Sequence, residues 1–210
     1  MHHEPDEAAT SFSVRRNVLT PLREFLDHGY GLHCEQSDER PCTAEVEAFA
    51  IGEARLTDVR MSALTLSPRH KAQSDDGYLY VKLVESGSLL LEQNGERCRL
   101  PANSLAIVDP AIPFTERFDD TTHLIVIHFP KAALRARGFH CHFGHWMVPD
   151  MRSPDVMMIH DMIRFVASRQ VALGNTTRAL LGTQLIDLMG VLVDAGHALP
   201  REALYRATSR

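Results

Sequence analysis

The chain has 210 residues, of which 44% are hydrophobic and 23% charged, the composition of an ordinary globular protein with a substantial core. A formal charge of −5 argues against attraction of the whole chain to nucleic acid. No apolar run is as long as the roughly 18 residues of a membrane-spanning helix, and the acidic start differs from a signal peptide. We therefore expect a cytoplasmic protein. Its four cysteines lack CxxC spacing and are expected to be free thiols.

The first part of the chain is predicted to contain one short helix after a flexible tail. Residues 1–13 are polar and terminal, which favours a tail. The segment "VRRNVLTPLREFLDHGYG" follows, with Leu22 and Phe25 on one helical face. Gly29 and Gly31 are expected to end this helix.

Short strand-like segments separated by turns fill the chain from about residue 44 to residue 130. Asn94 and Gly95 lie between two of these segments. An Asn-Gly pair is the strongest short-range hairpin signal, because both turn positions tolerate positive φ. Many closely spaced strands favour a sandwich or barrel. We assign residues 14–135 to this barrel and residues 136–152 to a loop after it.

Two long helices are predicted to form an antiparallel hairpin over residues 153–197. Ser153 is suited to the N-cap and Pro154 to the first helical position. The apolar surface of the hairpin is wider than one stripe, which suggests a second copy of the chain as partner. Candidate residues for this dimer interface are Leu181, Leu185, Leu188, Leu192, Met158 and Met162.

One continuous motif carries a family resemblance: "LVESGSLLLEQNGERCRLPANSLAIVDPAIPFTERFDD". It resembles the cupin barrel of the sensor half of AraC/XylS-type transcription regulators, and more specifically the AraC-binding-like domain. The shared features are a small-residue turn, "EQNG", "LP", an aspartate before "PF", and an acidic turn. Asn103 departs from the glycine expected in the "P-G-D" turn, but asparagine tolerates the left-handed conformation.

The resemblance implies a mainly β fold with α: a cupin-like jelly-roll barrel, preceded by a short helix and followed by an antiparallel two-helix hairpin. It also implies a sensor that binds a small organic effector, without enzymatic activity or cofactor. The implied partners are a second copy of the chain and, through a helix-turn-helix domain absent from this sequence, DNA. No membrane partner is expected. Residues 198–210 would be a tail or the start of the linker to that domain.

A metal-dependent cupin enzyme, such as a dioxygenase or isomerase, is the alternative. Such an enzyme needs a histidine pair and a carboxylate on one strand and a further histidine on a later strand. This sequence has His70 alone in the first position and His128 on the last strand. In addition, "GFHCHFGHW" places His140, His142 and His145 in one short loop as weak metal candidates. The competing interpretation of that segment is a polar loop packed against the barrel.

Polar residues on the predicted strands are the candidates for effector binding. Period-2 alternation puts Tyr78, Tyr80 and Lys82 on one face of "YLYVKLV" and the leucines and Val81 on the other, and either face could line the barrel. Arg55 and Arg60 could each pair with a carboxylate ligand, or lie on a solvated strand face. The full candidate set is His70, Tyr78, Tyr80, Lys82, Arg55, Arg60 and His128.

Overall fold

The computed structural model describes residues 10–14, 19–37, 40–68, 77–139, 141 and 144–197. The strands are β1 (Thr10–Val14), β2 (Leu32–Gln36), β3 (Thr43–Ile51), β4 (Ala54–Ser62), β5 (Leu64–Pro68), β6 (Tyr78–Ser86), β7 (Ser88–Gln93), β8 (Glu96–Pro101), β9 (Ser104–Val108), β10 (Phe114–Phe118) and β11 (Thr122–Pro130). The helices are α1 (Leu19–Tyr30), α2 (Lys131–Ala136), α3 (Pro154–Arg169), α4 (Asn175–Asp187) and α5 (Met189–His197).

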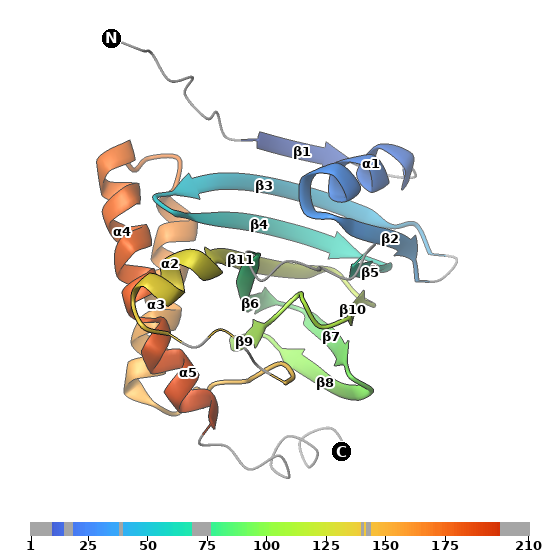
Figure 1. Ribbon diagram of the computed structural model, residues 1–210. Helices are drawn as coiled ribbons and strands as arrows, with labels where there is room; N and C mark the ends of the chain where they lie inside the picture. Colours follow the sequence, from blue (N-terminus) through green and yellow to red (C-terminus); the bar gives the residue numbers. More distant parts are fainter. Residues whose placement is uncertain are drawn as a thin grey trace.

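The strands form two antiparallel sheets that face each other. The order is β1-β3-β4-β11-β6-β9 in the six-stranded sheet and β2-β5-β10-β7-β8 in the five-stranded sheet. Helices α2 to α5 gather on one side of the strands, and α1 lies on the opposite side of the molecule (Figure 1). The expected order of helix, barrel and helical region is confirmed.

The six-stranded sheet separates two hydrophobic cores. Leu79, Val81 and Leu83 of β6 pack outward with residues of α3, α4 and α5, such as Ile159. Val84 packs inward, in the core between the two sheets. Both faces of β6 are therefore buried, which is why sequence alternation alone does not tell which face lines the barrel.

Two turns required by the barrel use residues with positive φ. The β7–β8 hairpin turns at Asn94 and Gly95, with φ of 54° and 76°, and Gln93 pairs with Glu96 across it. This confirms the predicted Asn-Gly hairpin. Asn103 has φ of 63° in the turn between β8 and β9, so asparagine adopts the left-handed conformation there.

The amino-terminal region contributes more to the fold than a tail. Residues 10–14 form β1 and pair with β3, so the expectation of a tail is wrong for residues 10–13. Pairing with a distant strand is a tertiary contact that the local composition does not reveal. Helix α1 ends at Tyr30, and Gly31, which follows it, has a φ of 62°. Leu22 and Leu26 of α1 pack into the core between the sheets.

The carboxy-terminal helices pack closely on the barrel. Pro154 begins α3, as predicted, and the second predicted helix is divided into α4 and α5 at Leu188. Gly182 of α4 lies directly against the backbone of Ile51 at the end of β3, where any Cβ would overlap the Ile51 carbonyl. Arg164 Nε, 2.7 Å from Glu85 Oε1, joins α3 to β6.

Burial corrects part of the expected dimer interface. Leu185 and Leu192 are only 2% and 1% exposed, because they cover the outer face of the six-stranded sheet within this chain. Leu181 and Leu188 are half-buried against the same core. Among the proposed interface residues, Met158 is the exposed one, at 51%.

Candidate functional site

A cavity lies between the two sheets, closed at one side by α1. Its volume is about 40 Å³. A single buried water needs about 10–15 Å³ on this scale, so the cavity has room for more than one water-sized group. Six polar residues line it: Tyr30, Thr57, Tyr80, Lys82, Glu116 and His128. The remaining wall is apolar and includes Leu26, Val59, Met61, Leu66, Phe118 and Val126.

A buried ion pair crosses this cavity from sheet to sheet. Lys82 Nζ of β6 lies 2.6 Å from Glu116 Oε1 of β10, and the two side chains are 5% and 2% exposed. The ammonium also lies 5.3 Å from the ring centre of Tyr80 and 5.8 Å from that of Phe114. Glu116 Oε1 has no hydrogen-bond partner among the described residues apart from this ionic contact. Each buried charge depends on its partner, because removing one residue of the pair would leave the other charge buried and uncompensated.

His128 is the centre of an aromatic cluster at one end of the cavity. Its ring centre is 4.6 Å from that of Tyr80, 5.7 Å from that of Tyr30 and 6.2 Å from that of Tyr78. Its Nε2 shares a hydrogen bond with Thr57 Oγ1 over 3.1 Å. Burial lowers the pKa of His128 to about 3, and the nearby charges of Lys82 and Arg55 act in the same direction. The imidazole is therefore neutral at physiological pH.

Tyr80 is neutral as well. Its burial raises the pKa of the phenol to about 12, and the carboxylate of Glu116 adds to this effect. The site consequently offers two neutral groups, an imidazole and a phenol, beside a fixed ion pair. Such groups orient a ligand by hydrogen bonding without a change of charge.

Strand register explains why these residues meet. Arg55, His128 and Tyr80 are direct cross-strand neighbours on β4, β11 and β6. Thr57 and Lys82 flank Val126 in the same way, two residues further along. Residues paired across neighbouring strands share a face, so the two rows form one polar end of the barrel.

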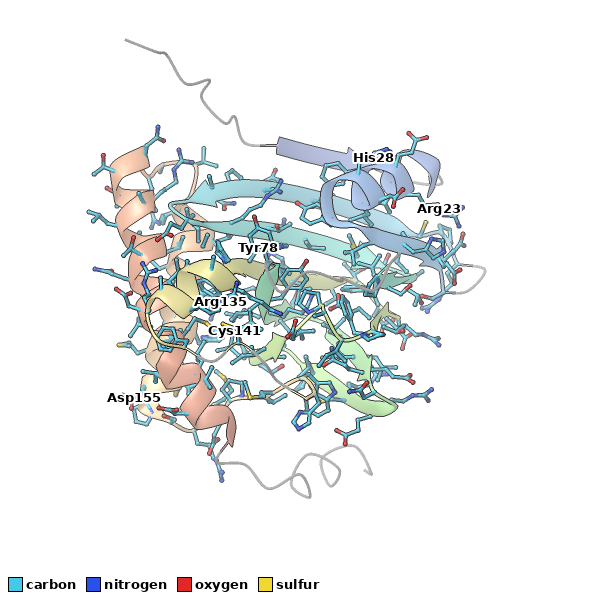
Figure 2. All side chains as sticks on the ribbon, in the orientation of Figure 1. Arg23, His28, Tyr78, Arg135, Cys141 and Asp155 are labelled. Atoms are coloured by element: carbon cyan, nitrogen blue, oxygen red, sulfur yellow. The ribbon has the colours of Figure 1, made fainter. Side chains whose placement is uncertain are left out.

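Arg55 lies beside this polar end. Its guanidinium carbon is 5.1 Å from the ring centre of Tyr30, the last residue of α1. None of the described residues forms an ion pair with Arg55. The buried hydroxyl of Tyr30 likewise has no hydrogen-bond partner among the described residues. Tyr78, labelled in Figure 2, begins β6 and is 47% exposed. Its ring centre lies 6.2 Å from that of His128.

The structure brings together most of the effector-binding candidates. Tyr80, Lys82 and His128 line the cavity, and Arg55 and Tyr78 adjoin it. Arg60 lies on the other face of β4, where its Nη1 is 3.3 Å from Asp58 Oδ1, in keeping with the alternative of a solvated strand face. His70 lies outside the described residues.

Sequence reasoning missed Glu116, Thr57 and Tyr30. The alternating segment "FTERF" places Glu116 in line with Phe114 and Phe118, which is a signal that the glutamate faces the apolar side. Tyr30 had no such signal, because its place at the cavity depends on how α1 packs.

The metal alternatives gain no support from the described residues. Within the described ranges, no group of three His, Cys, Asp or Glu residues is arranged to hold a metal ion. His145 Nδ1 contacts the carbonyl oxygen of Trp146 over 2.5 Å. His140 and His142 lie outside the described residues. No helix in the described part of the chain is both long and apolar enough to cross a membrane.

Comparison with known proteins identifies the family. The model of the AraC-binding-like domain matches residues 23–193. An uncharacterised protein in the nit 5' region of Bacillus sp. (strain OxB-1) is 22% identical over 192 residues, covering 90% of this chain and 72% of that protein. The crystal structure of the AraC-like transcriptional activator CuxR is similar, with a TM-score of 0.72 at 13% identity, over 89% of this chain and 70% of that one. The match to CuxR supports the cupin-like barrel and helical pair as a fold. The chain belongs to the AraC-binding-like domain family.

Proposed function

We propose that this chain is the sensing part of an AraC-type regulator and binds a small organic effector between its two sheets. The observation that carries this proposal is the cavity itself. It is apolar over most of its wall and has its polar groups concentrated at one end, which is the usual make-up of a small-molecule site. A purely structural core would be expected to avoid a buried Lys82–Glu116 pair, since apolar residues of similar size are at least as stable.

The six-stranded sheet, which has a hydrophobic core on each face, connects the effector cavity to the carboxy-terminal helices. Along β6, Tyr80 and Lys82 line the cavity, whereas Leu79, Val81 and Leu83 pack in the core shared with the carboxy-terminal helices. A ligand that shifts Tyr80 or Lys82 would therefore also shift the residues on the opposite face of β6, which contact the carboxy-terminal helices. For regulation, the effector must favour one helical arrangement, typically by about 1–3 kcal/mol. An attached or partner DNA-binding domain would respond to that arrangement.

A ligand screen with a cavity-filling variant tests the sensing function. An effector that binds the folded state raises the melting temperature by mass action. Val126→Phe fills the cavity and should abolish that response, and Val126→Leu should weaken it. Ile125→Leu, on the helix-facing side of the same strand, is the matched control. Stabilising compounds that act equally on all variants would contradict binding in the barrel.

We also propose that two copies associate through the exposed side of α3. Met158, Met162 and Phe165 share one face of this helix, since successive residues turn by about 100°. Met158 and Phe165 are 51% and 53% exposed. Asp155 begins the same face, at the outer edge of the helical layer (Figure 2), and Arg169 ends it. Antiparallel pairing about Met162 would set Asp155 opposite Arg169 of the second copy.

Two neighbouring methionines provide the test of this interface. Met157 is 50% exposed, almost the same as Met158, but lies about 100° around α3 from it. Met158→Asp should convert a dimer to a monomer in sedimentation velocity, whereas Met157→Asp should not. Equal behaviour of the two variants would remove α3 as the interface.

A further inference from the structure

We propose that the effector is a small monocarboxylate with a short apolar body, whose carboxylate binds between Arg55 and the hydroxyl of Tyr30. This inference rests on the proposed function and specifies the chemistry of its ligand. It is carried by the charges and unpaired polar atoms at the polar end of the cavity and by the size of the apolar part.

The charges at the polar end do not balance among the described residues. Lys82 and Arg55 supply two positive charges, and Glu116 supplies one negative charge. Lys82 and Glu116 compensate each other over 2.6 Å, whereas Arg55 contacts the ring of Tyr30. His128 is neutral and adds no charge. A charge in a partly dehydrated site favours an opposite partner, so an anionic ligand fits better than a neutral or cationic one.

Tyr30 supplies a second, independent feature. Its hydroxyl is buried at the cavity and lacks a hydrogen-bond partner among the described residues. Leaving a buried hydroxyl unpaired is costly, and a carboxylate oxygen would accept a hydrogen bond from it. Because the guanidinium of Arg55 lies 5.1 Å from the centre of the same tyrosine ring, one carboxylate can reach both groups.

The apolar part of the cavity limits the body of the ligand. The wall beyond the polar end consists of side chains such as Val59, Leu66 and Phe118, which offer no partner for a second charged group. The cavity volume of about 40 Å³ favours a short aliphatic body. A second carboxylate on the ligand would be left without a partner in this wall.

Isothermal titration with 3-methylbutanoate and its neutral amide, 3-methylbutanamide, tests the assignment. The wild-type protein should bind the carboxylate at least about tenfold more tightly than the amide. Arg55→Gln should remove this preference, and Tyr30→Phe, which deletes only the hydroxyl, should reduce it. Arg60→Gln is the matched control, because Arg60 lies on the opposite face of the same strand beside Asp58. This control should retain the wild-type preference.

The outcomes separate the two proposals. Equal binding of carboxylate and amide, or a preference unchanged in Arg55→Gln, overturns the carboxylate assignment and leaves a small-molecule site in the barrel standing. Tighter binding of the amide than of the carboxylate would also overturn the carboxylate assignment and leave a small-molecule site in the barrel standing. Failure of both probes overturns the assignment, and the thermal screen with Val126→Phe then decides whether any organic ligand enters the barrel. Circular dichroism establishes that each variant is folded, and Tyr30→Phe remains informative if Arg55→Gln is not.

Discussion

Removing one member of the Lys82–Glu116 pair should destabilise the protein far more than removing both. The two charged atoms are 2.6 Å apart, and the side chains are 5% and 2% exposed. Lys82→Met or Glu116→Leu alone leaves one buried charge without its partner, which costs about 3–5 kcal/mol. Replacing both members with apolar residues of similar size removes both dehydrated charges. The double variant should therefore be as stable as the wild type, or more stable by about 1–4 kcal/mol.

Urea denaturation followed by circular dichroism measures these differences. A loss of about 3–5 kcal/mol is a large part of the 5–15 kcal/mol by which a typical domain is stable, so each single variant should unfold at clearly lower urea. The exposed pair Arg97–Glu92 on β7 and β8 has nearly the same separation, 2.7 Å, and provides the control. Arg97→Met should cost less than about 1 kcal/mol. A single cavity variant within 1 kcal/mol of the wild type, or a double variant less stable than either single one, would refute the reasoning.

Three further predictions follow from other parts of the structure. The folded pKa of His128, about 3, is below its unfolded value, so the protein should lose stability as pH falls from about 6.5 towards 3, by up to about 1.4 kcal/mol per pH unit. His128→Gln should flatten this dependence in urea titrations at several pH values, and parallel curves would contradict the assignment. Gly182→Ala should lower stability by about 1–3 kcal/mol, because the added methyl overlaps the Ile51 carbonyl. Gly174→Ala, where the methyl meets open space, should change the melting temperature little, and equal losses in both variants would argue against the close approach of α4. Burial raises the pKa of Cys34 to about 12 and of Cys98 to about 11, so both thiols should react with Ellman's reagent only after unfolding. Rapid labelling of either thiol in the native protein would show that the barrel opens.

Local signals were sufficient for several elements. The Asn94–Gly95 hairpin and the start of α3 at Pro154 were predicted because each depends on the conformational preference of the residues themselves. The strand-rich region followed in the same way from closely spaced turns. These features depend on residues that are close together in the sequence, so one sequence is enough to predict them.

Features that depend on tertiary packing were not predictable in this way. The facing of Lys82 stayed open because both faces of β6 are buried, and alternation tells a strand's two faces apart only when one meets water. Leu185 was expected at a dimer interface, but its apolar side chain covers the outer face of the six-stranded sheet within the same chain. Glu116 and Tyr30 became recognisable as site residues only when β10 and α1 were placed beside Lys82 and His128.

Native mass spectrometry tests the central claim, that the barrel holds a small organic effector, most directly. The wild-type protein and the Val126→Phe variant, whose cavity is filled, would each be incubated with small-molecule extract of the source cells and then transferred to the gas phase. We expect the wild type to retain one organic molecule that the Val126→Phe variant does not. An adduct with the mass of a metal ion, identical adducts in both proteins, or no adduct on the wild type would contradict the account.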